Sequence, residues 1–138
     1  MAGLFSRLQK RSIGHHPYCT AVVVAAGSAS RMKGIDKIMT TLGGIPVLAR
    51  TLQALEQCGR IDEIVVVTRT DLCAPVNILC REFGIQKVTA VVSGGATRAE
   101  SVRCGLCAVS GRAELAAIHD GARPFVSQEL LERVLIAG

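Results

Sequence analysis

The chain has 138 residues, of which 49% are hydrophobic and 20% are charged, so a disordered protein is excluded and one compact folded domain is favoured. Aromatic residues make up only 3%, and this leaves little for stacking nucleic-acid bases. The formal net charge of +5 suits an anionic partner, but the cations are spread along the chain, so we expect a phosphate-bearing small molecule rather than a nucleic acid.

The N-terminal segment, residues 1–18, is basic and lacks the long apolar stretch of a secretory signal. We expect it to be a flexible extension of a domain that spans residues 19–138, in a cytoplasmic protein that does not bind membranes. Six cysteines in such a chain are expected to be free thiols. Cys104 and Cys107 form a C-x-x-C pattern inside a predicted helix, where packing is favoured over metal binding or redox chemistry.

The first predicted strand is the apolar run 21–26, which is continuous rather than alternating, as expected of a strand buried on both faces of a parallel sheet. Small residues follow at 27–30, and Arg31, Lys33 and Lys37 then add positive charge. Backbone N–H groups in such a turn can approach a ligand closely, so the loop suits phosphate.

Helices and strands alternate downstream of this loop. Ile45-Pro46 begins a helix whose apolar residues recur at helical spacing. The later predicted elements are a strand at 61–68, a helix capped by Asp71 that runs to Phe83 and stops at Gly84, a strand at 87–92, a helix from Arg98 to about Val109, a strand at 114–119 and a helix at 128–136 capped by Ser127. Four β-α units predict an α/β fold, a three-layer α/β/α sandwich around a Rossmann-like, mostly parallel sheet.

The loops after the first, third and fourth strands share one edge of this predicted sheet. They lie at the carboxyl ends of parallel strands, where open α/β sheets bind ligands, so they can form one site. Asp120 is the only carboxylate in the last of these loops and is expected to follow a buried strand. Since Mg²⁺ keeps much of its water and takes one or two protein carboxylates, a single aspartate is sufficient to hold it.

The first loop departs from two common phosphate loops. The dinucleotide fingerprint needs glycines where Ala29 and Met32 stand, and the P-loop needs Ser or Thr after the lysine, where Ile38 follows Lys37. The loop instead resembles the A-A-G-x-G-x-R-M-x…K signature of nucleotidyltransferases, with Ala29 in place of a glycine.

Three motifs together carry a narrower resemblance, namely AAGSASRMKGIDK at 25–37, SGGATRAESV at 93–102 and HDGARP at 119–124. They resemble the cytidylyltransferase family that acts on 2-C-methyl-D-erythritol 4-phosphate in the non-mevalonate isoprenoid pathway. The resemblance covers nearly all of residues 20–138 and implies an enzyme that transfers CMP from CTP to this sugar-alcohol phosphate, with release of pyrophosphate.

The resemblance also implies roles for individual residues. Arg31 and Lys37 match the family residues that stabilise the transition state, and Asp120 matches the residue that binds Mg²⁺. The implied CTP-binding positions are Ala25, Ala26, Gly27, Gly94, Gly95, Ala96, Arg98 and Ser101, with the backbone of the glycine turn reading cytosine.

Members of the family continue with further strands, a dimerisation arm and basic residues that hold the acceptor. The resemblance therefore implies a truncated chain that retains the CTP half-site and lacks the acceptor half, from a full-length protein that is a homodimer. Two alternatives stay open: the related enzyme that uses ribitol 5-phosphate, and a non-catalytic nucleotide-binding module.

Overall fold

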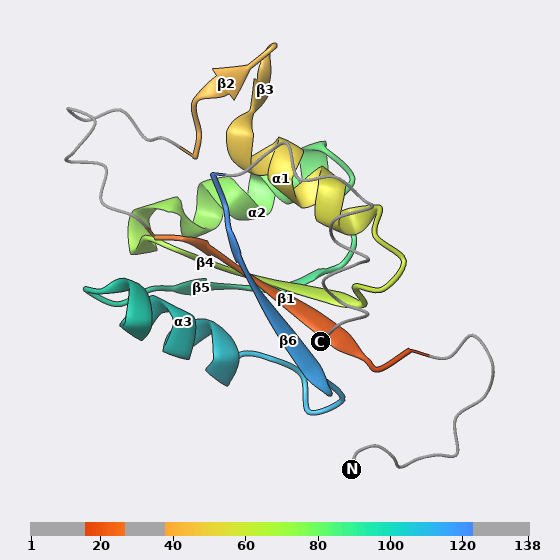
Figure 1. The fold of residues 1–138 in the computed structure, drawn as a ribbon. Helices are drawn as coiled ribbons and strands as arrows, with labels where there is room; N and C mark the ends of the chain where they lie inside the picture. The colour runs from red at the N-terminus through yellow and green to blue at the C-terminus, as the bar shows by residue number, and fades with distance from the viewer. Residues whose placement is uncertain (1–15, 27–37, 123–138) are drawn as a thin grey trace.

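The computed structural model describes residues 16–26 and 38–122. In this part of the chain, four parallel strands form the main sheet in the order β5-β4-β1-β6 (Figure 1). The strands are β1 (Cys19–Ala25), β4 (Glu63–Thr68), β5 (Val88–Ser93) and β6 (Leu115–Asp120), and the helices are α1 (Val47–Glu56), α2 (Cys73–Glu82) and α3 (Arg98–Cys107). No helix among the described residues has the length and apolar character needed to cross a membrane.

Strand β1 lies between β4 and β6, and six of its seven residues are buried. Its alternate side chains face two different layers: Val23 joins the core under α1 and α2, whereas Val22 lies against Gly105 of α3. Figure 1 shows α1 and α2 on one face of the sheet and α3 on the other. The predicted three-layer α/β/α arrangement around a parallel sheet is therefore confirmed.

The larger core fills the space between the sheet and the pair α1 and α2. Helix α1 presents one apolar stripe to it, because Leu48, Leu52 and Leu55 recur at helical spacing and are 0–1% exposed. Burying a side chain of this size stabilises the fold by about 1.5–3 kcal/mol. This layer fixes α1 against the middle of the sheet.

A short hairpin between β2 (Thr41–Leu42) and β3 (Ile45–Pro46) precedes α1 and was not predicted from the sequence. Gly43 and Gly44 form its two-residue turn with φ angles of 65° and 83°, values that glycine reaches without steric cost. Helix α1 then begins directly after Pro46, as predicted.

The prediction that Asp71 caps a helix is wrong. Asp71 lies in the 3₁₀ turn η2 (Thr70–Leu72), and Leu72 precedes α2 without a side-chain cap. Both Asp71 oxygens instead accept hydrogen bonds from the guanidinium of Arg69, each at 3.1 Å. The predicted stop at Gly84 is confirmed by its φ of 67° immediately after the C-cap residue of α2.

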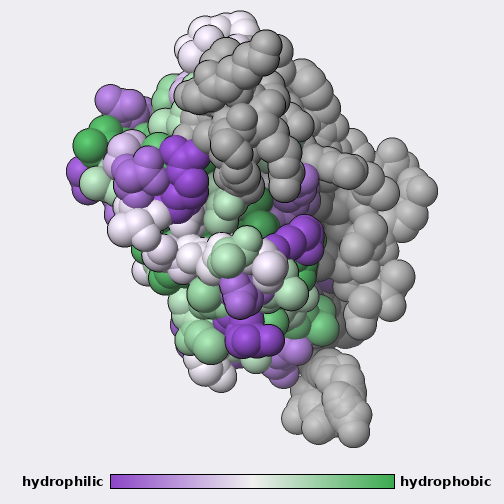
Figure 2. Space-filling model, turned by 90° about the vertical axis from the view of Figure 1, so that its left-hand side faces the viewer, coloured by the Kyte–Doolittle hydropathy of each residue, from purple (hydrophilic) through white to green (hydrophobic). Residues whose placement is uncertain are grey.

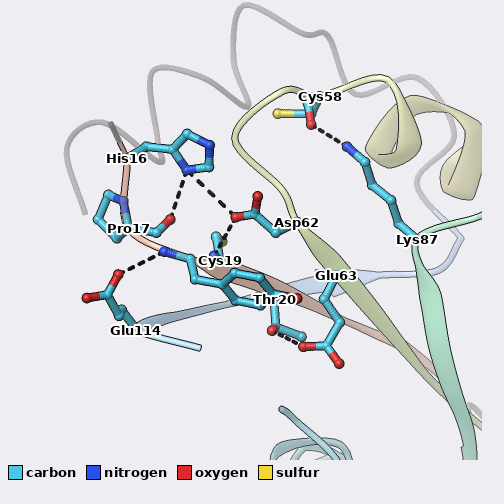
Figure 3. Close-up of polar contacts among 10 residues, drawn as sticks. His16, Pro17, Cys19, Thr20, Cys58, Asp62, Glu63, Lys87 and Glu114 are labelled. Carbon is cyan, nitrogen blue, oxygen red and sulfur yellow. Dashed lines mark hydrogen bonds and ion pairs between the residues drawn. The ribbon is translucent and has the colours of Figure 1, made fainter. Parts of the chain in front are cut away.

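A buried carboxylate ties the amino ends of three strands together. Glu63 of β4 is 3% exposed, and it accepts a hydrogen bond from the hydroxyl of Thr20 on β1 at 2.6 Å (Figure 3). It also accepts one from the hydroxyl of Thr89 on β5. The backbone N–H of Ser110 adds a third bond, at 3.3 Å. Burial by itself raises the pKa of Glu63, but these bonds and the charge of Arg112 outweigh it and hold the pKa below the ordinary value of 4.5.

The remaining sequence predictions about the ends of the chain lie outside the described residues. They concern residues 1–15 of the predicted extension at 1–18, and the capped helix at 128–136. The flexibility of the extension and the domain boundary at residue 19 stay predictions.

Candidate nucleotide-binding site

The loops after β1 and β5 contact each other directly. A Cβ atom placed on Gly94 would lie 2.8 Å from the Cβ of Ala26 and 2.5 Å from the Oγ of Ser101, distances at which no side chain fits. Ala26 follows directly after Ala25, the buried last residue of β1. The structure therefore brings together four of the predicted CTP-binding residues at the carboxyl end of β1, namely Ala25, Ala26, Gly94 and Ser101.

Thr68, the last residue of β4, holds both loops in place, and sequence reasoning did not single it out. Its hydroxyl donates a hydrogen bond to the carbonyl oxygen of Ala25 at 3.2 Å, and its own carbonyl accepts one from the N–H of Gly94 at 2.8 Å. The side chain is fully buried. The available signal was a threonine at the carboxyl end of an otherwise valine-rich strand.

The N–H groups that follow Gly94 are occupied within the loop itself. Gly95 donates to the Oγ of Ser101 at 3.2 Å, while Ala96 and Thr97 donate to the Oε1 of Glu100 at 2.7 and 3.2 Å. Thr97 in turn accepts from the N–H of Glu100 at 3.1 Å, which completes a capping box at the start of α3. The T-x-x-E spacing carried this signal, which sequence reasoning missed.

This arrangement leaves the loop with acceptors rather than donors. Within the described residues, no hydrogen bond reaches the carbonyl oxygens of Gly94, Gly95 or Ala96, and the last two residues are exposed. Ser101 is 2% exposed, and because its oxygen accepts from Gly95, its proton points elsewhere. Arg98 is exposed at the first position of α3 beside this loop.

Asp120 lies on the other side of β1, at the end of β6 and in register with Val24. Its side chain is exposed, and its Oδ1 accepts from the N–H of Ala122 at 2.9 Å. No group of three metal-binding side chains is found in the described ranges, so a metal here would rely on Asp120 and on oxygens from water and ligand. That donor set fits Mg²⁺.

The expectation that Asp120 follows a buried strand is wrong, because every residue of β6 is at least partly exposed. One face of β6 is exposed at Ala116, Ile118 and Asp120, with Ile118 40% exposed. The reason is the position of α3, which packs on β1, β4 and β5. Strand β6 is at the edge of the described sheet, so α3 leaves this face of it exposed.

Other predicted site residues are not placed by the structure. Gly27, Arg31 and Lys37 lie outside the described ranges, so their roles stay predictions. All six cysteines are free thiols, as predicted, and the pair Cys104 and Cys107 lies within α3.

Figure 2 shows the side of the molecule on which β5 ends and α3 begins. Its described atoms form a mosaic of hydrophilic and hydrophobic residues rather than one continuous hydrophobic area. This surface suits a polar ligand better than an apolar one.

Comparison with known proteins gives a consistent set of similarities. A family model described as 2-C-methyl-D-erythritol 4-phosphate cytidylyltransferase matches residues 19–138. The enzyme of that name from Dehalococcoides mccartyi (strain CBDB1) is 40% identical over 85% of this chain and 51% of its own length. The chain thus spans about half the length of the relatives it matches.

Solved structures show the same likeness. The 4-diphosphocytidyl-2C-methyl-D-erythritol synthase of Anaerococcus prevotii DSM 20548 gives a TM-score of 0.76 at 31% identity, over 88% of this chain and 50% of that one. Rv0371c of Mycobacterium tuberculosis H37Rv, in complex with manganese, gives 0.66 at 25% identity, over 88% of this chain and 59% of that one.

Proposed function

The chain belongs to the 2-C-methyl-D-erythritol 4-phosphate cytidylyltransferase family, and we propose that it forms the CTP-binding half of an enzyme that transfers CMP from CTP to this acceptor and releases pyrophosphate. The observation that carries the proposal is the convergence of the Gly94 turn, Ala26 and Asp120 on the carboxyl end of β1. The names of the relatives support the methylerythritol phosphate as acceptor over ribitol 5-phosphate.

The Gly94 turn supplies the chemistry for cytosine. The exocyclic amine of cytosine is a donor, and the exposed carbonyl oxygens of Gly95 and Ala96 are acceptors that match it. Uracil presents a carbonyl at that position and would face these oxygens unfavourably. The Ser101 hydroxyl would donate its proton to an acceptor on the base, and Arg98, exposed at the first position of α3, would supply a positive charge for the phosphates.

The proposed reaction joins two anions. An oxygen of the acceptor phosphate attacks the α-phosphorus of CTP, a new P–O bond forms, and the bond to pyrophosphate breaks. We propose that Arg31 and Lys37 neutralise the negative charge that shifts between the phosphates during this step. Positioning and charge neutralisation are the main tasks of a protein in such a transfer.

A divalent cation, Mg²⁺ in our proposal, would neutralise part of the triphosphate charge, and Asp120 would hold it. The exposed carboxylate supports this assignment, as does the manganese complex of Rv0371c. We also propose that the full-length protein is a cytoplasmic homodimer, which sedimentation of that protein can test.

Calorimetric titration of the chain with CTP, UTP, ATP and GTP in the presence of Mg²⁺ tests the proposal. We expect selective binding of CTP that is much weaker in Asp120→Ala and unchanged in Glu82→Ala, a control that removes an exposed carboxylate at the end of α2. Equal affinity for CTP and UTP would contradict the cytosine assignment, and the absence of all nucleotide binding would overturn the proposal for this chain.

The acceptor needs a separate experiment. We expect the full-length protein to turn over the methylerythritol phosphate. Turnover of ribitol 5-phosphate alone would replace our first choice of acceptor.

A further inference from the structure

The hydroxyl of Thr51 in α1 reaches the turn that carries Asp120. Thr51 is fully buried, and its Oγ1 lies 2.9 Å from the carbonyl oxygen of Gly121 and 3.2 Å from that of Val47. A threonine within a helix commonly bonds the carbonyl four residues back, which here is Val47. Because a hydroxyl has a single proton, the shorter contact indicates that Gly121 is its principal acceptor.

Gly121 is the residue directly after Asp120, and its peptide groups are held from two sides. Its N–H donates to the carbonyl of Val24 on β1 at 2.9 Å, while its carbonyl accepts from Thr51 on α1. A Cβ atom placed on Gly121 would lie 3.0 Å from that of Ala25, so the turn rests closely on β1. Helix α1 and the central strand together set its orientation.

We propose that Thr51 is a positioning residue for the Asp120 carboxylate, acting through the Gly121 peptide to aim that carboxylate at a divalent cation bound with CTP. The inference rests on the proposed role of Asp120 in holding the metal. Without the Thr51 hydroxyl, the buried Gly121 carbonyl loses its hydrogen-bond donor. Because an unsatisfied buried acceptor costs free energy, rotation of the peptide toward water becomes favourable. The direction of the neighbouring carboxylate changes with it.

A second contact makes Asp120 sensitive to that rotation. Its Oδ1 accepts from the N–H of Ala122, so the same turn that Thr51 fixes also fixes one of the two carboxylate oxygens. Groups that orient a metal ligand from outside the first coordination sphere typically change metal affinity by about 10- to 100-fold when removed. Thr51 would be such a group, because it holds the turn that orients the Asp120 carboxylate.

The test measures the affinity of the chain for Mn²⁺ at saturating CTP, and its affinity for CTP without metal. We compare the unaltered chain with Thr51→Val, which keeps the shape and removes the hydroxyl, Thr51→Ser, which keeps the hydroxyl, and Asp120→Asn. We expect Mn²⁺ affinity to fall by about 10-fold or more in Thr51→Val and to stay near its original value in Thr51→Ser. CTP affinity without metal should be unchanged in both Thr51 variants.

The outcomes separate this inference from the proposed function. If Asp120→Asn weakens Mn²⁺ binding and Thr51→Val does not, the inference is wrong while the metal role of Asp120 stands. If Asp120→Asn leaves Mn²⁺ binding unchanged, the proposed metal site is wrong and the inference falls with it. If Thr51→Val weakens metal-free CTP binding as much as Mn²⁺ binding, Thr51 has a structural role only and the inference is overturned.

Discussion

Gly94 packs against Ala26 so closely that the loops following β5 and β1 leave no room for a side chain between them: a Cβ atom on Gly94 would lie 2.8 Å from that of Ala26. We expect Gly94→Ala to lower the free energy of unfolding by about 1–3 kcal/mol, because the added methyl group also meets Ser101 and Val67. CTP affinity should fall as well. Urea unfolding and calorimetric titration measure the two effects.

Gly111→Ala is the matched control for this substitution. A Cβ atom there would meet nothing within 4 Å, so we expect little change in stability or in CTP affinity. If Gly94→Ala were as well tolerated as Gly111→Ala, the close packing of the two loops would have no energetic consequence.

The capping box at the start of α3 predicts a difference between two substitutions of Thr97. Thr97→Ala removes the acceptor for the Glu100 N–H and should cost about 1 kcal/mol, whereas Thr97→Ser keeps it and should cost much less. Chemical denaturation distinguishes them. Equal losses in both variants would show that the cap contributes nothing.

Glu63 predicts a dependence of stability on pH. Because its pKa is lower in the folded chain than the ordinary value of 4.5, its ionised form stabilises the fold above that pH. The contribution is lost as the pH falls through the lower, folded-state pKa. Glu63→Gln should therefore reduce the free energy of unfolding by about 1–3 kcal/mol at pH 7, with a difference that shrinks toward pH 3.

Glu82→Gln, at an exposed position of α2, is the control for this series and should follow the unaltered chain at every pH. Urea unfolding at several pH values supplies the comparison. A Glu63→Gln difference that stayed constant from pH 7 to pH 3 would contradict a stabilising charge.

The cysteines should differ strongly in their rates of alkylation. Burial and the nearby Asp62 and Cys58 raise the pKa of Cys19 to about 11, compared with an ordinary value of 9.0, so about a hundredfold less of it is thiolate. Burial, with Glu56 nearby, also raises the pKa of Cys80. Mass spectrometry after iodoacetamide treatment at pH 8 should show modification of the exposed Cys107 first, and early modification of Cys19 would contradict the prediction.

Arg31 and Lys37 should affect turnover more than binding. If they neutralise charge in the transition state, Arg31→Ala or Lys37→Ala in the full-length enzyme should lower kcat by about 10²- to 10³-fold with a smaller change in CTP affinity. Lys33→Ala removes a neighbouring cation of the same loop and is the control. An unchanged kcat in the first two variants would remove both residues from the mechanism.

The sequence predicted the four strands of the main sheet because short, apolar, β-branched runs favour strands buried in a parallel sheet, but it did not predict the short hairpin of β2 and β3. The run at 21–26 became β1, and the valines at 65–67 became the middle of β4. Competition between neighbouring groups for the same side chain was harder to predict. Asp71 is a good helix cap by type, but the guanidinium of Arg69 binds both of its oxygens.

The motifs of the site could be predicted from the sequence, but the residues that hold its loops in place through hydrogen bonds could not. Gly94, Gly95 and Asp120 could be identified from their positions after predicted strands and from the family resemblance. Thr51 and Thr68 could not, because each acts through a hydrogen bond to a carbonyl far away in the chain. The use of N–H groups in the Gly94 turn has local partners instead, Glu100 and Ser101, and the T-x-x-E spacing at the start of α3 was the signal for the first of them.

The strand order has a kinetic consequence. Strand β1 comes first in the chain, but its partners β4 and β6 come much later, and both parallel pairings close long loops. The proposed nucleotide site can form only after β1 has paired with both β4 and β6. A short fragment of the chain therefore cannot bind CTP in the proposed way. Nucleotide binding is then linked to the folding equilibrium: CTP should raise the urea concentration at the midpoint of unfolding, because it binds only molecules in which both strand pairings are complete.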